Sequence, residues 1–233
     1  MRSPFLLEIS VETAEAAAAA ERGGAQRIEL CAELSLGGLT PSEELMRRVR
    51  ELVRVPIFAM VRPRAGDFVY SPEEVSQMRR DIATAKRARM DGIVLGVLTA
   101  ERHVDGERTR ELVKLAEPLP VTFHRAFDEV ADIDGALEAV IETSAARILT
   151  SGGAPTAPQG LAALAKMIAA AGNRITIVPG SGVNPSNILE VVQRTQAREF
   201  HSGLGTRIPY GSRNGALFED EVRKMAHLLA GLA

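Results

Sequence analysis

Residues 121–130 read VTFHRAFDEV, an apolar segment that passes into His124, Arg125 and Asp128 without an intervening glycine or proline. Valine, threonine and phenylalanine are typical of β-strands. Burying ionisable side chains is costly unless they are paired or hydrogen-bonded. Charge at the end of a buried strand therefore indicates that the strand ends at a site.

Seven similar segments recur along the chain, and stretches with helix signals separate them. In SVETAEAAAAAERGG, residues 10–24, polar residues precede an alanine-rich run and glycine ends it. A strand followed by a helix, eight times over, is the pattern of a (β/α)₈ TIM-type barrel. The other segments are FLLEIS (5–10), RIELC (27–31), VPIFAMV (55–61), GIVLGVL (92–98), ARILTS (146–151), RITIVPG (174–180) and REFHSG (198–203).

The chain has 233 residues, which suits one such barrel, and we expect a single domain over residues 1–233. A doubly wound open sheet is the competing architecture. It would need eight units in one long sheet, or two domains, and no linker-like change in composition divides the chain.

The composition excludes several classes of protein. The 28 basic and 30 acidic residues are interspersed and only 4% of residues are aromatic, which argues against a nucleic-acid binder. No apolar run reaches the roughly 18 residues of a membrane span, and the N-terminus lacks a signal-peptide pattern. The lone Cys31 excludes an internal disulfide. We expect a cytoplasmic protein with no membrane or nucleic-acid partner.

Side chains alternate along a strand, so one set faces the helices and the other faces the barrel interior. Apolar residues should face the helices. In LLEIS, Leu7 and Ile9 take that side, which directs Glu8 and Ser10 inward. By the same rule the interior receives an unusually polar set: Arg27, Glu29, Cys31, Phe58, Met60, Arg62, Thr122, His124, Glu199 and His201.

Five polar residues of this interior come at or near the C-terminal ends of their strands, where barrel active sites are built. With Asp128, which follows the fifth strand, they are the predicted catalytic residues. The alternative is a buried network that satisfies itself, in which two glutamates pair with Arg27 and Arg62. The five residues are Glu8, Glu29, Arg62, His124 and His201.

The loops after the strands supply candidates for binding an anion. Arg64 and Asp67 follow the third strand, and Arg125 follows the fifth. Glycine-rich loops after the last strands of a barrel often hold a phosphate through backbone N–H groups, and Arg207 lies just downstream of them. The predicted backbone donors are Gly180, Ser181, Gly182, Gly203 and Gly205, and Ser151 and Gly152, after the sixth strand, are further predicted anion-binding residues.

Two carboxylates, a histidine and arginines at one mouth suit the removal of a proton beside a carbonyl group. In this interpretation Glu29 or Glu8 is the base, and His124 is the acid or the partner of the oxyanion. Arg62 and Arg64 would hold a small anionic, perhaps phosphorylated, substrate. An isomerase, epimerase or lyase would use such a set. The lysines all fall in helical segments, which disfavours a Schiff-base aldolase.

Six motifs carry a family resemblance: RIELC, GGLTPS, VRPRAGDFVYS, VTFHRAFD, RILTSGG and EFHSG, in this order. At these motifs the sequence resembles the CutC family, which is named for copper homeostasis. The likeness extends from about Leu6 to Arg207. It implies a TIM-type barrel that self-associates as a homodimer or larger homo-oligomer, and a cytoplasmic role linked to Cu(I) binding.

Cys31 is the predicted copper ligand under this resemblance, because Cu(I) prefers thiolate and thioether sulfur. Met60 on the neighbouring third strand is the candidate thioether partner. The alternative is that Cys31 is a small buried hydrophobe. Copper needs neither arginines nor paired carboxylates, so the polar cluster fits an anionic small molecule better than a soft metal.

Three hypotheses stay open at this point. The first is a copper-handling protein that binds Cu(I) through Cys31, with no other cofactor. The second is a barrel enzyme that acts on a small anionic substrate. The third is a ligand-binding barrel without catalysis, which only turnover would distinguish from the second.

Overall fold

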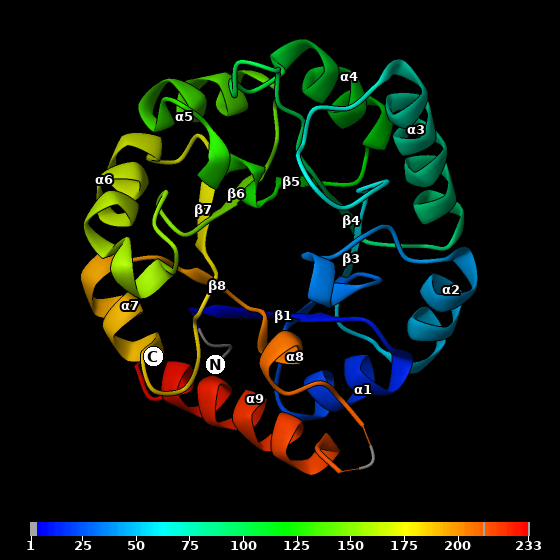
Figure 1. Ribbon diagram of the computed structural model, residues 1–233. Helices are drawn as coiled ribbons and strands as arrows, with labels where there is room; N and C mark the ends of the chain where they lie inside the picture. The colour runs from blue at the N-terminus through cyan, green and yellow to red at the C-terminus, as the bar shows by residue number, and fades with distance from the viewer. Residues whose placement is uncertain (1–3, 212, 233) are drawn as a thin grey trace.

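The chain folds as a (β/α)₈ barrel in the computed structural model, which describes residues 4–211 and 213–232 (Figure 1). Each of the eight predicted segments contains one strand, so the barrel prediction is confirmed. The strands are β1 (Leu6–Val11), β2 (Arg27–Leu30), β3 (Ile57–Met60), β4 (Gly92–Leu95), β5 (Val121–Phe123), β6 (Arg147–Thr150), β7 (Thr176–Pro179) and β8 (Glu199–Ser202).

The strands pair in parallel in the order β7-β6-β5-β4-β3-β2-β1-β8, and β7 and β8 lie beside each other to complete the ring. The register of β1 has a direct consequence for the interior. Glu8 is paired with Arg27 of β2 on one side and with His201 of β8 on the other. A carboxylate is thereby placed between a guanidinium and an imidazole.

Helices surround the strands, as Figure 1 shows. None of the described helices is long and apolar enough to cross a lipid bilayer. The helices are α1 (Ala14–Arg22), α2 (Glu43–Leu52), α3 (Pro72–Arg87), α4 (Gly106–Ala116), α5 (Ile133–Glu142), α6 (Leu161–Ala171), α7 (Ile188–Thr195), α8 (Leu204–Arg207) and α9 (Gly215–Ala230), with the 3₁₀ turns η1 (Leu34–Leu36), η2 (Arg125–Glu129) and η3 (Ala157–Gln159).

Local sequence explains where these helices begin. At α3 the Ser71 side chain accepts a hydrogen bond from the backbone N–H of Glu74, and the Glu74 carboxylate accepts one from the N–H of Ser71. This capping box satisfies two N–H groups that a helix start leaves without partners. Pro72 follows in the first helical position, where its missing N–H is no loss.

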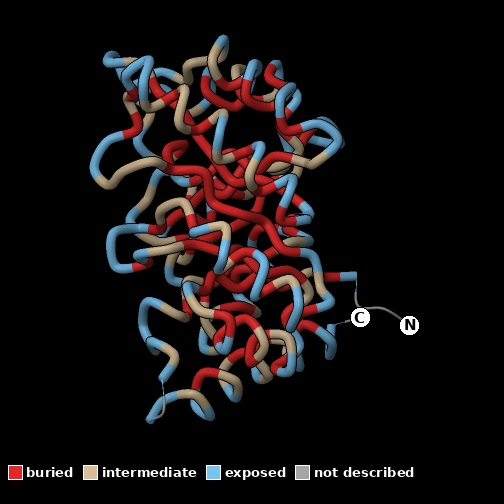
Figure 2. Tube along the Cα trace, turned by 90° about the vertical axis from the view of Figure 1, so that its right-hand side faces the viewer, coloured by how far each residue is buried: buried red, intermediate tan, exposed pale blue. Residues whose placement is uncertain are grey.

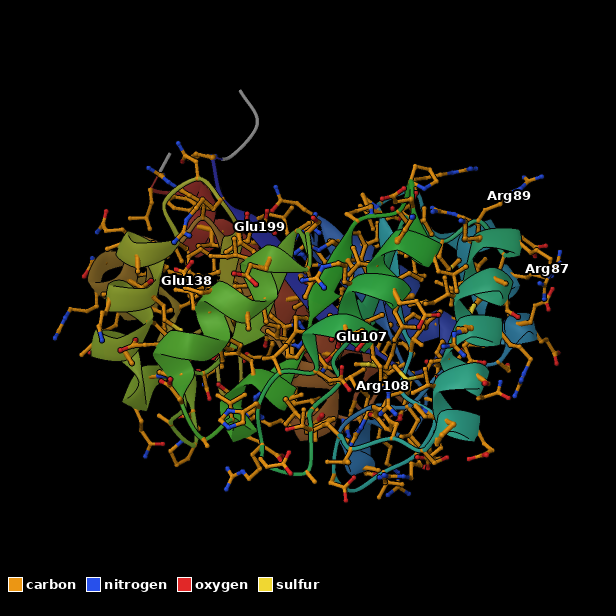
Figure 3. All side chains as sticks on the ribbon, turned by 90° about the horizontal axis from the view of Figure 1, so that it is seen from above. Arg87, Arg89, Glu107, Arg108, Glu138 and Glu199 are labelled. Atoms are coloured by element: carbon orange, nitrogen blue, oxygen red, sulfur yellow. The ribbon has the colours of Figure 1, made fainter. Side chains whose placement is uncertain are left out.

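The apolar core lies between the strands and the ring of helices (Figure 2). Leu7, Ile9, Ile28 and Leu30 have no exposed surface, in agreement with the predicted helix-facing side of β1 and β2. Charged side chains such as Arg87 and Glu138 project from the outer faces of the helices (Figure 3). The polar residues assigned to the interior are therefore separated from the outer surface by an apolar layer.

Three of the predicted interior residues lie just beyond the strands that were expected to carry them. β5 ends at Phe123, and His124 caps η2. Cys31 and Arg62 follow β2 and β3. All three are nevertheless buried, so they belong to the rim of the barrel rather than to its shaft.

Phe58 fills the shaft of the barrel and depends on the absence of a side chain at Gly92. The guanidinium carbons of Arg27 and Arg147 lie 4.9 and 4.7 Å from the centre of its ring. A Cβ at Gly92 would come within 2.5 Å of Phe58 Cζ. The ring cannot move aside without disturbing both arginines.

We predict that Gly92→Ala lowers the free energy of unfolding by about 1–3 kcal/mol, because it overpacks the shaft. Urea denaturation measures the change. Gly106→Ala is the matched control, since a Cβ at Gly106 meets no atom within 4 Å. It should leave stability unchanged or raise it. Equal stability of the two variants would contradict this account of the shaft.

Candidate functional site

A cavity of about 820 Å³ opens at the C-terminal ends of the strands. Its floor consists of residues from strand ends, and the segments after β2, β3, β5, β6, β7 and β8 form its walls. Five of the six predicted catalytic residues line it. Its lining includes Glu29, Leu34, Leu36, Met60, Arg62, Phe68, His124, Arg125, Asp128, Ser181, Gly182, His201, Gly203 and Arg207.

Glu8 is the sixth predicted catalytic residue, and it lies within a network of ion pairs in the shaft. Its carboxylate accepts a hydrogen bond from Arg27 Nε, and its Oε1 lies 2.7 Å from His201 Nδ1. Burial alone would raise the pKa of Glu8, but Arg27 and His201 lower it to about 2. Glu8 is thus an ionised partner of other groups and does not line the cavity.

Glu199 continues this network toward the other end of the barrel. Arg27 Nη2 lies 2.8 Å from Glu199 Oε2, and Arg147 Nε donates to the same oxygen at 3.2 Å. Arg147 is a member of the interior that sequence reasoning missed. The alternation rule applied to RILT would have placed it inward, because Ile148 faces the helices.

Glu29 is the carboxylate of the cavity floor, and it is incompletely paired. Its Oε2 accepts a hydrogen bond from the Cys31 thiol, with 3.6 Å between the heavy atoms, and lies 3.9 Å from His201 Nε2. Its Oε1 is buried and has no hydrogen-bond partner. Burial raises the pKa of Glu29, and the neighbouring Glu8 carboxylate adds to the effect.

His201 stands between the two glutamates. Burial alone would lower the pKa of this imidazole, but Glu29 and Glu8 outweigh burial and raise the pKa. Its two ring nitrogens face one carboxylate each. The three residues bring ligand atoms within 4.8 Å of one another, a spacing that a metal ion could span. Arg27 already neutralises Glu8, which makes this group less suited to a cation.

His124 is a neutral imidazole with one unused nitrogen. Its Nδ1 accepts a hydrogen bond from the N–H of Ala126 at 3.2 Å, which assigns the ring proton to Nε2. Nε2 is buried and has no hydrogen-bond partner. Burial, and then the charge of Arg62, lowers the pKa of His124 to about 3. Gly96 makes room for the ring, because a Cβ there would lie 2.5 Å from Nδ1.

Arg62 does not pair with the glutamates of β1 and β2. Its Nη1 donates to the carbonyl oxygens of Leu36 and Gly38 at 2.9 and 3.2 Å, and its Nη2 donates to that of Gly66 at 2.9 Å. The guanidinium also lies over Phe68, 4.8 Å from the ring centre. The suggested pairing of interior arginines with Glu8 or Glu29 is therefore confirmed for Arg27 and wrong for Arg62.

Asp128 belongs to η2, and its carboxylate bonds to the loop that follows β6. Its carboxylate accepts hydrogen bonds from the Thr150 hydroxyl and from the N–H groups of Ser151 and Gly153, and it pairs with Arg125 at 2.9 Å. Two of the predicted anion-binding residues, Ser151 and Gly152, donate their N–H groups to Asp128 and to the Thr150 hydroxyl, respectively.

The other predicted anion-binding residues divide into two groups. Gly180 donates its N–H to the carbonyl oxygen of Thr150 and does not line the cavity. Ser181, Gly182 and Gly203 do line it. Arg64 and Asp67 pair with each other at 2.8 Å outside the cavity, and Arg64 also pairs with Glu74 at 2.6 Å.

Cys31 lies below the cavity in a small apolar cluster with Leu34, Phe58, Met60 and Val94. It has no exposed surface. Burial, and then the carboxylate of Glu29, raises the pKa of the thiol well above its ordinary value. The predicted copper ligand is therefore a protonated thiol in this environment.

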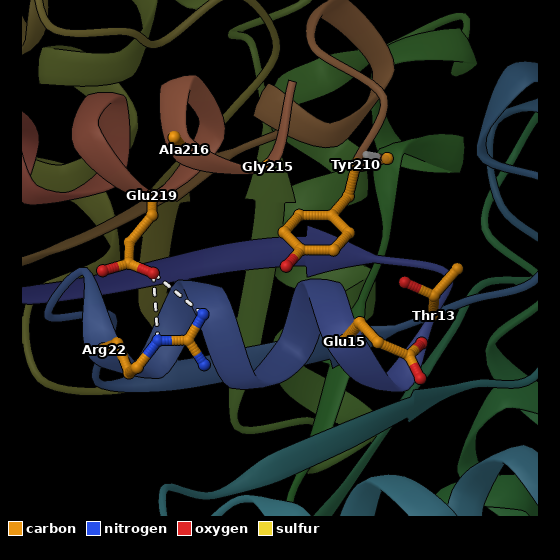
Figure 4. A pocket seen from close by; sticks show the side chains of 8 residues that line it. Thr13, Glu15, Arg22, Tyr210, Gly215, Ala216 and Glu219 are labelled. Atoms are coloured by element: carbon orange, nitrogen blue, oxygen red, sulfur yellow. Dashed lines mark hydrogen bonds and ion pairs between the residues drawn. The ribbon is translucent and has the colours of Figure 1, made fainter. Parts of the chain in front are cut away.

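A second hollow of about 510 Å³ lies on the outside of the barrel, between α1 and α9 (Figure 4). Arg22 and Glu219 on its wall pair with each other at 2.8 Å. Glu15 pairs with Arg48 of α2. The charged groups of this hollow are thus satisfied within the protein, unlike those of the barrel mouth.

Comparison with known proteins agrees with the fold and with the resemblance seen in the motifs. Residues 5–206 match the CutC family. The chain is 45% identical over 204 residues to the human copper homeostasis protein cutC homolog, covering 87% of this chain and 75% of that one.

Two solved structures place the fold among known barrels. A copper homeostasis protein CutC from Streptococcus agalactiae superimposes with a TM-score of 0.81 at 29% identity, covering 85% of this chain and 98% of that one. A thiamine phosphate pyrophosphorylase from Pyrococcus furiosus has a TM-score of 0.64 at 18% identity, covering 97% and 98%, which shows the fold alone. By its match to the family and its identity to the human homolog, the chain belongs to the CutC family.

Proposed function

We propose that this chain is a barrel enzyme that moves a proton on a carbon atom beside a carbonyl group of a small anionic molecule. One observation carries the proposal. Glu29 Oε1 and His124 Nε2 are both buried without a hydrogen-bond partner, and both residues line the same cavity. Leaving a buried polar atom unpaired costs about 1–3 kcal/mol. A substrate that engages both atoms would recover that free energy.

The two residues have the protonation properties that such a step needs. A carboxylate removes the proton as general base. Burial raises the pKa of Glu29, which makes its carboxylate a stronger base. A neutral imidazole can donate a hydrogen bond to the carbonyl oxygen and polarise it. With a pKa of about 3, His124 stays neutral and keeps its Nε2–H as a donor.

The anionic part of the substrate would lie on the β7 and β8 side of the mouth. Ser181, Gly182 and Gly203 line the cavity there. Arg207 is exposed at the same rim and forms no ion pair with another described residue. The arginines first expected in this role, Arg62 and Arg64, are both engaged by the loops that follow β2 and β3.

A ligand-binding barrel without catalysis shares the cavity and every polar group in it. Turnover alone separates it from an enzyme.

The proposal includes three further points: a single domain over residues 1–233, self-association as the family resemblance implies, and a reducing cytoplasmic compartment. Cys31 is buried and forms no disulfide bond, which is consistent with that compartment.

Hydrogen exchange into candidate substrates tests the proposal directly. Pyruvate, dihydroxyacetone phosphate and related carbonyl compounds would be incubated with the protein in D₂O, and deuterium at the carbon beside the carbonyl would be followed by NMR. We expect exchange above the solvent rate with at least one compound. Glu29→Gln should lower it by about 10²–10⁴-fold and His124→Gln should slow it.

The control for this experiment is Glu15→Gln, which removes a carboxylate from the outer hollow and should not affect exchange. Binding without exchange by the wild-type protein would favour the ligand-binding barrel. If the wild-type protein neither binds any of these carbonyl compounds nor exchanges their hydrogen, the proposed site is contradicted.

The neutral state of His124 also predicts how stability depends on pH. The pKa of His124 falls from 6.5 to about 3 on folding. The folded protein therefore binds fewer protons than the unfolded chain in this window, and stability is lost as the pH drops below about 6.5. The contribution reaches about 1.4 kcal/mol per pH unit.

Denaturant unfolding of the wild type and of His124→Gln between pH 6.5 and 5 measures this contribution. The wild type should lose stability more steeply than the variant. Parallel curves for the two proteins would mean that His124 is protonated in the folded state, and the assignment of a neutral donor would fail.

Handling of Cu(I) is a second candidate function, favoured by the proximity of two sulfur-bearing side chains. A Cβ at Gly38 would lie 3.0 Å from Cys31 Sγ and 3.6 Å from Met60 Cε, so both side chains lie against the same glycine. A thiolate and a thioether suit Cu(I). The thiol must lose its proton to bind, and its raised pKa opposes this.

We predict that Cys31→Ser abolishes Cu(I) binding and leaves the fold intact, and that Met60→Leu weakens binding. Competition with a chromogenic Cu(I) chelator under anaerobic, reducing conditions measures the affinity. Met46→Leu, a buried methionine of α2, is the control. Unchanged affinity in Cys31→Ser would exclude Cu(I) binding at Cys31.

A further inference from the structure

A flap formed by residues 32–39 covers part of the cavity. Two backbone hydrogen bonds between Ala32 and Leu39, of 2.9 and 2.7 Å, close the flap at its base. Within it lies η1, and four consecutive flap residues line the cavity: Leu34, Ser35, Leu36 and Gly37. The flap is therefore a wall of the site and a discrete loop at the same time.

The inner side of the flap lies against the groups assigned to function. Leu34 packs in the apolar cluster with Cys31 and Met60, and Gly38 lies directly against Cys31. Cys31 has no exposed surface, and Glu29 Oε1 is buried. In this arrangement the flap closes the site from the side of β2 and β3.

Two side chains from other parts of the chain hold the flap in place. Arg62 donates to the carbonyl oxygens of Leu36 and Gly38, and the Glu12 carboxylate accepts from the N–H of Leu34 at 2.8 Å. Arg62 also donates to the carbonyl oxygen of Gly66, so one guanidinium ties the flap to the loop after β3.

Few hydrogen bonds hold the flap to the rest of the protein. The flap reaches its closed shape through left-handed backbone at Gly37 and Gly38, with φ of 86° and 85°. Outside its base, the flap forms hydrogen bonds with only two other side chains among the described residues, Arg62 and Glu12. Arg62 Nε, next to the cavity, is buried without a hydrogen-bond partner.

We propose that Arg62 is a positioning residue that keeps the flap of residues 32–39 closed over the site, and that opening of the flap admits ligands to Glu29 and Cys31. Arg62 acts through the flap and does not itself hold the substrate anion. For a substrate of Glu29, this control of access rests on the proposed function. The same flap would also control the access of a metal ion to Cys31.

The single cysteine makes flap opening measurable without a substrate. Cys31 is buried beneath the flap, so a small thiol reagent such as 5,5′-dithiobis(2-nitrobenzoic acid) can react only when the flap opens. We expect Arg62→Lys, which keeps the charge but cannot bridge three carbonyl groups, to raise the labelling rate roughly tenfold or more.

Arg64→Lys is the matched control, because Arg64 is the neighbouring loop arginine and bonds to Ala65, Asp67 and Val69 rather than to the flap. It should label at the wild-type rate. Amide hydrogen exchange adds a spatial readout: protection should fall in residues 34–38 and stay unchanged in β5 and α6. Equal labelling of the two variants, or a loss of protection throughout the barrel, would overturn the proposal.

A second variant keeps the test independent of how well Arg62→Lys folds. Glu12 is exposed, and Glu12→Ala removes the other anchor of the flap. Because the Glu12 charge also helps to raise the pKa of the Cys31 thiol, amide exchange in residues 34–38 is measured beside the labelling rate. It should also accelerate labelling of Cys31, whereas Glu15→Ala on α1 should not. Because no substrate is present, failure of the hydrogen-exchange assay for catalysis and failure of this test are separate results.

Discussion

The interior of this barrel depends on the pairing of buried charges. Glu8 and Glu199 carry the negative charges in the shaft, and Arg27 and Arg147 carry the positive ones. Removing one partner of a buried pair is strongly destabilising, because it leaves the other charge uncompensated. The ring face of Phe58 attracts both guanidinium groups, and the Glu199 Oε2 oxygen lies within 3.2 Å of a nitrogen of each. The position of His201, and through it the cavity floor, rests on this arrangement.

The shaft and the mouth both contain buried polar atoms without a hydrogen-bond partner. In the shaft these atoms are Arg27 Nη2, Arg147 Nη1 and Thr122 Oγ1, although both arginines are paired with glutamates. At the mouth they belong to Glu29, Arg62 and His124, which line the cavity. Folded proteins pair the great majority of their buried polar atoms. The three exceptions that line the cavity are typical of a site that is completed by a ligand.

Much of the fold was predictable, because the strand and helix signals of a (β/α)₈ barrel repeat along its sequence. The alternation of LLEIS and RIEL correctly directed Glu8, Arg27 and Glu29 inward, since their neighbours Leu7 and Ile28 must face the helices. Arg147 obeys the same rule, because its neighbour Ile148 has no exposed surface and faces the helices.

The partners of the site residues were not predictable in the same way. Arg62 follows β3, where strand alternation no longer applies, and its partners are backbone carbonyl groups that any sequence would supply. Asp128 likewise bonds to N–H groups of a loop about twenty residues away along the chain, which no spacing rule reveals. Sequence identified the residue types at the mouth, whereas the loop geometry decided which of them are free to meet a ligand.

The carboxylate of Asp128 makes the two sides of the barrel mouth different from each other. It accepts hydrogen bonds from the N–H groups of the loop after β6 and pairs with Arg125, so those N–H groups are not available to an anionic ligand on that side. The loops after β7 and β8 have no such resident anion among the described residues. A molecule with one charged end would therefore enter in a single orientation, with that end toward β8 and its neutral end toward β2 and β5. Such an asymmetry would let the barrel distinguish one face of a planar carbonyl group from the other. The loops at the mouth would then decide which face reacts.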